Sequence, residues 1–293
     1  MLEVVTKQEA QQIINPINNN FVIADEEKTV LKENVSNLPL TEVKQLPSGF
    51  KGYPEGTKIS YTPLTLGELE ALNSSDMDFT RGIAMLLNSI HCNTVKVEDL
   101  YYWDVIYIGI QRKLLAFGDT RGVLYNQCPK CGNIVEHEFD YTEIDFNILD
   151  VPDLPVRTKI NDIEVEFSLI TIKDFLQLNE ERGELDIYAR MIKNLPYQQA
   201  YELVKNCHGK ASKLIKYIDK QLGYGIQPFI VNCDNVIEVE NPDYDAKKRG
   251  SKKMLKETCN EEIAMEVRSP FEVVFPQDTD ELDNDFEIQF GKA

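Results

Sequence analysis

Two stretches of this chain, far apart in the sequence, follow the same pattern of residues. Residues 58–73 read KISYTPLTLGELEALN, and residues 164–179 read EVEFSLITIKDFLQLN. Each begins with the alternation of a strand and continues to a threonine with an acid three residues later, such as Thr65 and Glu68. That spacing is typical of a capping box at the start of a helix. The offset between the stretches exceeds the roughly 20–50 residues of a solenoid unit, so the sequence predicts a duplicated domain.

The similarity continues downstream of both stretches. Residues 112–128 read RKLLAFGDTRGVLYNQC, and residues 219–233 read DKQLGYGIQPFIVNC. In each we expect a helix end, an aromatic residue followed by glycine, a short strand and a cysteine. Gly118 and Gly225 suit the left-handed position that ends a helix, because glycine has no Cβ to clash there. The predicted repeat therefore runs from strand through helices to a hairpin that carries cysteine.

The fold class predicted from these patterns is α+β, with two internally duplicated strand-helix-hairpin lobes, a zinc-knuckle-like element and an extended N-terminal arm. The predicted division of the chain is an N-terminal arm at 1–43, a first repeat lobe with a CxxC knuckle at 44–150, a second repeat lobe with an inserted basic hairpin (about 238–256) at 151–276, and an acidic C-terminal tail at 277–293.

Periodicity predicts the individual elements. The expected helices are 66–73, 79–90, 97–117, 172–182, 184–193, 197–206 and 210–222. The expected strands are 57–62, 122–127, 134–140, 156–168, 228–240 and 262–275. Trp103 falls in the third of these helices, where we expect it to pack in the core.

The charge of the chain limits its partners. Its 49 acidic residues outnumber its 31 lysines and arginines, and the formal net charge is −18. Such a chain repels phosphate backbones and anionic membranes unless a local basic patch reverses the field. Residues 247–256 are the one basic patch, and we expect them to face an acidic protein surface or solvent. The sequence therefore predicts no nucleic-acid partner.

Export and membrane insertion have no support in the sequence. No run approaches the roughly 18–20 apolar residues that cross a bilayer. The first residues, MLEVVTKQEA, have neither the basic start nor the apolar core of a secretory signal. We expect a protein that is made in the cytoplasm and has no membrane partner.

Six cysteines in a chain of this kind favour free thiols or a metal site over disulfides. Cys128-Pro-Lys-Cys131-Gly, followed by an alternating strand, is typical of a zinc knuckle, in which a tight turn brings two thiolates to one metal. One such pair supplies half of a tetrahedral site. A redox role for the pair is the alternative, but that chemistry favours a helix N-terminus within a βαβ unit, and here a strand follows.

The internal repeat predicts the other two ligands. Cys233 stands at the repeat position of Cys128, and the next cysteine is Cys259. If a hairpin has been inserted between them, they form a displaced second pair, and the predicted structural zinc site is Cys128, Cys131, Cys233 and Cys259. The alternative is a decayed second knuckle whose thiols bind no metal. Cys92 and Cys207 are expected to pack as small buried thiols or to lie at helix ends.

Catalysis has little support. The three histidines, His91, His137 and His208, do not neighbour a nucleophile motif, and no glycine-rich phosphate loop is present. His137 lies on the strand after the knuckle, where its place in the alternation indicates a solvent-facing side chain. We expect a protein that is not an enzyme and takes no small-molecule substrate.

Several segments in order resemble the baseplate hub and hub-assembly proteins of contractile-tailed bacteriophages of the T-even type. They are LPSGFKGYP at 46–54, the helix start at 64–68, the stretch ending at 117–118, the CPKCG knuckle, the second helix start at 169–174, and SPFEVVFP at 269–276. The resemblance spans roughly 44–276. It implies a non-enzymatic structural or adaptor protein of the phage tail baseplate, assembled in the host cytoplasm, whose partners are other baseplate and tail proteins.

Two alternatives stay open at this point. A chaperone for assembly of the baseplate hub, absent from the mature virion, would also need a protein-binding surface. A zinc-ribbon regulatory protein would need a basic face around the knuckle, whereas Glu136, Glu138 and Asp140 make this region acidic.

Overall fold

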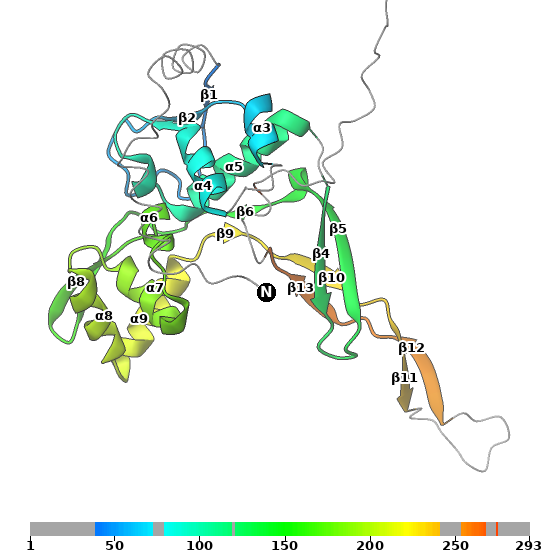
Figure 1. Ribbon diagram of the computed structural model, residues 1–293. Helices are drawn as coiled ribbons and strands as arrows, with labels where there is room; N and C mark the ends of the chain where they lie inside the picture. The colour runs from blue at the N-terminus through cyan, green and yellow to red at the C-terminus, as the bar shows by residue number, and fades with distance from the viewer. Residues whose placement is uncertain (1–38, 73–78, 119–120, 241–252, 268–273, 275–293) are drawn as a thin grey trace, which may run out of the picture.

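The computed structural model describes residues 39–72, 79–118, 121–240, 253–267 and 274. The fold mixes helices with small antiparallel sheets, as the sequence predicts (Figure 1). Most of the predicted N-terminal arm, the turn of the predicted basic hairpin and the acidic tail lie outside the described residues. None of the described helices has both the length and the apolar character needed to span a bilayer.

The first hydrophobic core surrounds one long helix. This part of the chain contains three antiparallel strands and four helical segments: β1 (Thr41–Glu42), β2 (Ile59–Tyr61), β3 (Ile90–Cys92), α3 (Leu66–Leu72), α4 (Phe79–Asn88), η1 (Val97–Asp99) and α5 (Tyr102–Phe117). Residues of β2, β3, α4, η1 and α5 pack in the core. On α5, Val105, Ile106 and Ile108 are fully buried. Gly118 ends this helix with φ 69, and its N–H donates to Leu114 O, as the sequence predicts.

The second core joins one hairpin to a group of helices. Its elements are β7 (Val156–Ile160), β8 (Ile163–Phe167), α7 (Glu184–Met191), α8 (Tyr197–Lys205) and α9 (Lys210–Gln221). Between β8 and α7 lie the short helices α6 (Ile172–Phe175), which packs against the first core, and η3 (Glu180–Arg182). The single strand predicted at 156–168 is wrong, because Asn161 and Asp162 take positive φ values of 48 and 66 and turn the chain into a hairpin. Asn and Asp tolerate this left-handed conformation better than other non-glycine residues do.

A third, smaller core lies between two hairpins. The first hairpin pairs β4 (Arg121–Gln127) with β5 (Ile134–Asp140), and the second pairs β10 (Phe229–Asn232) with β13 (Glu262–Met265). Asn126 Nδ2 donates to Ala264 O at 3.0 Å and links the hairpins directly. Between β10 and β13 the chain forms a further hairpin, β11 (Val236–Glu240) with β12 (Met254–Thr258). The prediction of one strand at 228–240 is wrong, because β10 ends at Asn232, β11 begins at Val236, and Cys233 lies between them.

The two predicted helix starts share one hydrogen-bond pattern. Thr65 N and Oγ1 donate to Glu68 Oε2, and Glu68 N donates back to Thr65 Oγ1. Thr171 and Asp174 form the same three bonds. The strand before each box also has an equivalent partner, since Tyr61 pairs with Ile90 and Phe167 bridges Ile192. These local features therefore recur in the two predicted repeat lobes, residues 44–150 and 151–276, which we call the two halves of the chain.

Two predicted helices are shorter in the structure. The helix predicted at 97–117 is broken at Leu100 and Tyr101, which adopt extended backbone because Tyr101 forms a β-bridge with Thr171. The helix predicted at 172–182 consists of α6 and η3. Between these two, Asn179 N donates to the side chain of Asp186 and not to a helical carbonyl.

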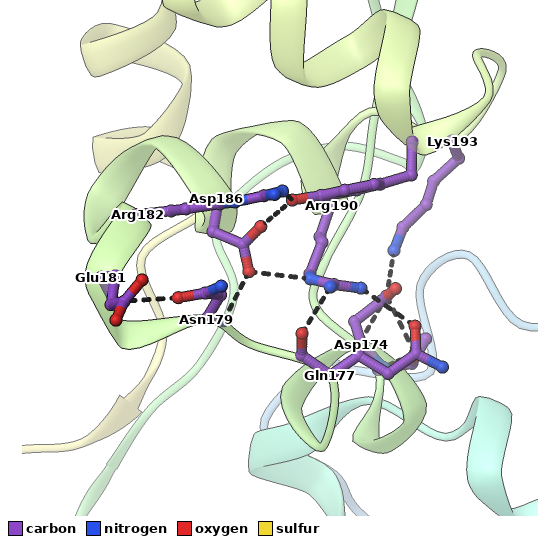
Figure 2. A network of polar contacts seen from close by, with 10 residues as sticks. Asp174, Gln177, Asn179, Glu181, Arg182, Asp186, Arg190 and Lys193 are labelled. Atoms are coloured by element: carbon purple, nitrogen blue, oxygen red, sulfur yellow. Dashed lines mark hydrogen bonds and ion pairs between the residues drawn. The ribbon is translucent and has the colours of Figure 1, made fainter. Parts of the chain in front are cut away.

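A buried polar network fixes the loop between α6 and α7 to helices α7 and α8 (Figure 2). Asp186 accepts hydrogen bonds from Asn179 N, Arg190 Nε and Tyr197 Oη. Arg190 also donates to the side chain and the carbonyl of Gln177. Burial raises the pKa of Asp186, but these hydrogen bonds outweigh it and the net pKa is lowered. The carboxylate is thus ionised and paired in the folded protein.

The junction between the halves excludes a side chain at Gly225. This residue lies in β9 (Gly225–Ile226), which pairs with β6 (Phe146–Asn147) just after the short helix η2 (Tyr141–Glu143). A Cβ at Gly225 would lie 2.5 Å from the indole of Trp103. The prediction that Gly225 ends a helix is therefore wrong, because α9 ends at Gln221 and Gly225 serves this close approach instead.

Asp104, in the first turn of α5, is a fully buried carboxylate at the same junction. It accepts hydrogen bonds from Ser48 N and Tyr53 Oη, each at 2.9 Å. Tyr101 and Tyr224 lie near it, and burial together with the charge of Asp104 raises the pKa of both tyrosines. Burial raises the pKa of Asp104 to about 6, although the bonds from Ser48 and Tyr53 oppose this effect.

This raised pKa predicts a dependence of stability on pH. Between about pH 4 and pH 6 the folded protein holds a proton that the unfolded chain releases, so the free energy of unfolding falls as the pH rises through this window. The contribution is at most about 3 kcal/mol. In Asp104→Asn this contribution should vanish. Urea unfolding of both proteins at pH 5 and pH 7.5 checks it, and equal pH slopes for the two would contradict the assignment.

Candidate metal centre

Four cysteines converge in the third core. The sulfur atoms of Cys128, Cys131, Cys233 and Cys259 all lie within 4.8 Å of one another. Cys128 Sγ lies 3.7 Å from Cys259 Sγ, and Cys131 Sγ lies 3.6 Å from Cys233 Sγ. Cys131 is partly exposed and the other three are buried. The structure therefore places the four predicted ligands together.

Equivalent backbone hydrogen bonds form the two halves of this cluster. In the first half, Cys128 N donates to Asn133 O, and Gly132 N donates to Cys128 O. In the second half, Cys233 N donates to Glu261 O, and Asn260 N donates to Cys233 O. Both residues that follow a ligand, Gly132 and Asn260, have positive φ, at 74 and 51. The turn at 259–261 thus reproduces the turn at 131–133.

The sulfur geometry fits a tetrahedral metal. Zinc–thiolate bonds of about 2.3 Å give sulfur–sulfur edges of about 3.8 Å in a regular tetrahedron. The two closest pairs, at 3.6 and 3.7 Å, are near this value and far longer than the roughly 2.05 Å of a disulfide bond. All six cysteines are free thiols, so no disulfide competes for these sulfurs. Thiolates in tetrahedral geometry favour zinc among the common metals.

The surrounding groups affect the four thiols unequally. The backbone N–H of Asn133, with further help from the Asn235 side chain, lowers the pKa of Cys131 to about 6. Although the backbone N–H of Asn235 lowers the pKa of Cys233, burial and the neighbouring thiols raise it overall to about 12. Four adjacent thiolates repel one another when no cation lies between them. This arrangement of donors therefore suits a divalent cation.

Two further side chains support the cluster, and the sequence did not identify either of them. Asn235 Nδ2 donates to Cys131 Sγ at 3.5 Å, and Lys130 Nζ donates to Cys259 O at 3.0 Å. Each residue belongs to one half of the cluster and contacts the other half. In the sequence, only their positions close to Cys233 and Cys131 could have indicated that they support the cluster.

The remaining cysteines and the knuckle histidine lie outside the cluster. Cys92 is in β3 and Cys207 follows α8, both partly buried; burial raises the pKa of Cys207. The prediction that His137 faces solvent is wrong. Its ring lies 5.1 Å from that of Phe229, and its Nε2 atom is buried with no hydrogen-bond partner among the residues that the structure describes. Val135 and Phe139 are buried on the same side of β5, so the inner face of this strand is the odd-numbered one.

Comparison with protein families gives one assignment. Residues 38–222 match the family described as T4 bacteriophage base plate protein. The chain belongs to this family. The match includes most residues of both larger cores and the Cys128–Cys131 knuckle, and it ends before Cys233 and Cys259. No curated protein matches the chain. No solved structure matches it either.

Family membership supports the sequence-based resemblance. It makes the chain a phage baseplate protein, of a family that is structural and belongs to the virion tail. Other phage tail proteins are the partners that such a protein has.

Proposed function

We propose that this protein is a rigid adaptor of the baseplate hub or inner baseplate, in which structural zinc joins two duplicated lobes and neighbouring tail proteins bind the fixed surface. The observation that carries the proposal is the convergence of Cys128 and Cys131 with Cys233 and Cys259. The first two lie in the turn that joins β4 to β5, and the others lie between β10 and β13. A metal held there cross-links segments more than a hundred residues apart in sequence.

The hairpins themselves explain why a cross-link is needed. A two-stranded hairpin is at best marginally stable in water. In the described part of the chain, the third core contains six buried residues, three of which are cysteines. When bound, zinc supplies folding energy of roughly 10 kcal/mol to a site of this kind. The backbone turns position the four sulfur atoms. Asn235 Nδ2 donates to Sγ of the partly exposed Cys131, and Lys130 Nζ donates to Cys259 O in the opposite turn.

Three local equivalences support the duplication. They are the two capping boxes, the two strand partners Ile90 and Ile192, and the two cysteine turns with matching hydrogen bonds. The proposed lobes are those predicted from sequence, at 44–150 and 151–276. Some contacts cross this boundary, since Ile172 belongs to the first core and Tyr101 to the second. The lobes would thus have become one interlocked unit after the duplication.

Metal analysis of the purified protein tests the zinc site. We expect one zinc per chain in the wild type, and loss of that zinc when Cys128 is replaced by serine. Cys92→Ser is the matched control and should keep the metal, because Cys92 lies outside the cluster. Equal zinc content in the wild type and Cys128→Ser would contradict the site.

Mass spectrometry of purified virions tests the role. An adaptor of the hub should be present in tails at a fixed number of copies per particle. An assembly chaperone is the second candidate, because it would use the same protein-binding surface, and it should be absent from mature particles. The zinc-ribbon regulator has weaker support, since Glu136 and Glu138 are exposed on the outer face of β5.

A further inference from the structure

Helix α9 carries a basic stripe on its exposed side. Its inner side packs in the second core through Ile215 and Ile218 (Figure 1). At about 100° per residue, the side chains that point away from this core form one continuous arc, which we call the basic face of α9. All of its residues are exposed, and none is acidic: Lys210, Lys213, Lys216, Tyr217, Lys220 and Gln221.

The one acid of α9 does not belong to the basic face. Asp219 is half-buried, and burial, followed by the charge of Glu184, raises the pKa of its carboxyl. In the described part of the chain, none of the four lysines of the basic face forms an ion pair. Like charges at successive turns of a helix repel one another. An acidic segment bound along α9 would therefore relieve this repulsion.

A groove of about 340 Å³ lies beside the basic face, between α9 and the segment 150–156. Tyr217 and Gln221 line the groove and also belong to the basic face, so the two surfaces are continuous. Asp150 and Asp153 belong to the wall that the segment 150–156 forms. The remaining side chains that line the groove are apolar: Val151, Pro152, Val156 and Ile218. The groove and the basic face together suit an occupant that is apolar on one side and acidic on the side toward the lysines.

The C-terminal segment of this chain has that pattern in its sequence. It lies outside the described residues, and residues 281–290 read ELDNDFEIQF. Because side chains of an extended chain point alternately to two sides, one side of this segment would be acidic and the other mostly apolar. The acidic positions are Glu281, Asp283, Asp285 and Glu287, and the apolar ones are Leu282, Phe286, Ile288 and Phe290.

The lengths of the two surfaces also agree. In an extended chain, the acids at 281–287 span about 20 Å, since each residue adds about 3.3 Å. The lysines at 210–220 span about 15 Å of α9, at about 1.5 Å per residue. Successive acids are therefore able to lie beside successive lysines.

The segment is attached close enough to reach α9. Val274, the last described residue, packs against Gly109 of α5, where an added Cβ would lie 2.4 Å from its Cγ1. Trp103, six residues before Gly109, contacts Gly225, which follows the last residue of α9 by four positions. The end of α9 thus lies within roughly 35 Å of Val274, whereas the chain from Val274 to Glu287 extends to about 43 Å.

We propose that residues 281–290 bind across the basic face of α9 of the same chain, with their acids toward the lysines and Phe286 in the apolar groove. The covalent connection gives the segment an effective concentration on the order of millimolar, which favours its own chain as the occupant. The bound segment would cover the basic face, so that any other acidic surface has to displace it. This inference goes beyond the adaptor role and needs neither that role nor zinc.

Photo-cross-linking in the full chain tests the contact. A photoreactive phenylalanine analogue at Phe286 should couple to α9 or to residues 150–156 of the same molecule, as detected by mass spectrometry of the monomer. Raising the salt from about 0.1 M to about 1 M should lower the yield, because the screening length falls from about 10 Å to about 3 Å. Coupling mainly to another part of the chain, to a second copy, to another protein or to nucleic acid would overturn the proposal.

Charge reversal on α9 tests the lysines and leaves the photoreactive group unchanged. In Lys213→Glu with Lys216→Glu, the intramolecular yield should fall about tenfold, which corresponds to about 1.4 kcal/mol, because two attractive contacts become repulsive. Lys44→Glu with Lys58→Glu is the matched control, since both lysines are exposed in the other half of the chain. This control should keep the yield of the wild type. Equal losses in the two variants would overturn the proposal.

A charge exchange separates a direct contact from a general effect of charge. Asp283→Lys with Asp285→Lys, added to the reversed α9 variant, should restore the intramolecular yield, because the signs on both surfaces are then exchanged. The same two substitutions in the wild-type background should lower the yield. Absence of this rescue would mean that the acids do not face Lys213 and Lys216, and it would overturn the proposal.

Discussion

Replacing Cys233 by serine should destabilise the region around the two hairpins more than any other single substitution in this chain. Cys233 is fully buried, and its sulfur lies 3.6 Å from that of Cys131. Because a structural zinc site contributes roughly 10 kcal/mol, loss of one ligand removes more free energy than the third core is able to replace. We expect the hairpins β4–β5 and β10–β13 to open while the two larger cores stay folded.

Hydrogen exchange measures this effect locally. In Cys233→Ser, amides of β5 and β13 should lose protection, whereas those of α5 and α9 should keep it. Treatment of the wild type with a zinc chelator should produce the same pattern. Cys207→Ser is the control, because Cys207 lies outside the cluster. A uniform loss of protection across the chain would mean that the cores depend on the site, and no change would mean that no metal is bound.

The convergence of the four cysteines was predictable because a local signal and the proposed repeat both indicate it. The spacing Cys128-Pro-Lys-Cys131 is a local motif, and comparison of the two predicted repeats placed Cys233 opposite Cys128. Cys259 followed only once an insertion was allowed between the second pair. Asn235 and Lys130 were missed, because a hydrogen bond from an amide or a lysine to the opposite turn leaves no spacing pattern in the sequence.

The fold was predictable where an element buries one face over several turns. Helix α9 begins at the predicted residue and ends one residue before the predicted end, and α5 ends at the predicted Phe117, since a repeated apolar stripe marks both. Strands β1, β6 and β9 have only two residues each, too few for a period, and form because a distant segment pairs with them. The break at Leu100 and Tyr101 has the same cause. Long-range contacts of this kind decide local structure without a local signal.

The inward position of His137 shows how a two-residue period becomes ambiguous. The sequence IVEHEF alternates, but His137 could belong with the buried valine and phenylalanine or with the exposed glutamates. Because successive side chains of a strand point to opposite faces, His137 shares a face with Val135 and Phe139, and this face packs against Phe229. The polarity of histidine favoured the other assignment, and the pleat of the strand overrides it.

Asp186→Ala should lower the free energy of unfolding by about 3–5 kcal/mol, because it breaks a buried ion pair from one side. The Asp186 side chain is 0% exposed and that of Arg190 is 10% exposed, and they meet at 3.1 Å. Without the carboxylate, the Arg190 guanidinium loses its buried counter-charge, and Asn179 N and Tyr197 Oη lose their acceptor (Figure 2). Chemical denaturation of the purified protein measures the loss.

An exposed ion pair in the same half of the chain is the control. Arg157 and Glu166 join β7 to β8 at 2.9 Å, with side-chain exposures of 74% and 35%. Since exposed pairs contribute about 0–1 kcal/mol, Glu166→Ala should change stability little. Comparable losses for Asp186→Ala and Glu166→Ala would contradict the buried network as the cause.

The pH dependence of the same variant separates this network from Asp104. Hydrogen bonds hold the pKa of Asp186 below its ordinary value despite its burial, so its contribution is present above the pKa of the unfolded chain and is lost as the pH falls through the folded pKa. Asp104 has the opposite sign, because burial raises its pKa to about 6. The stability lost in Asp186→Ala should therefore shrink as the pH drops below about 4. A loss that is constant over this range would mean that Asp186 stabilises the fold by packing alone and that the charge on its carboxylate contributes nothing.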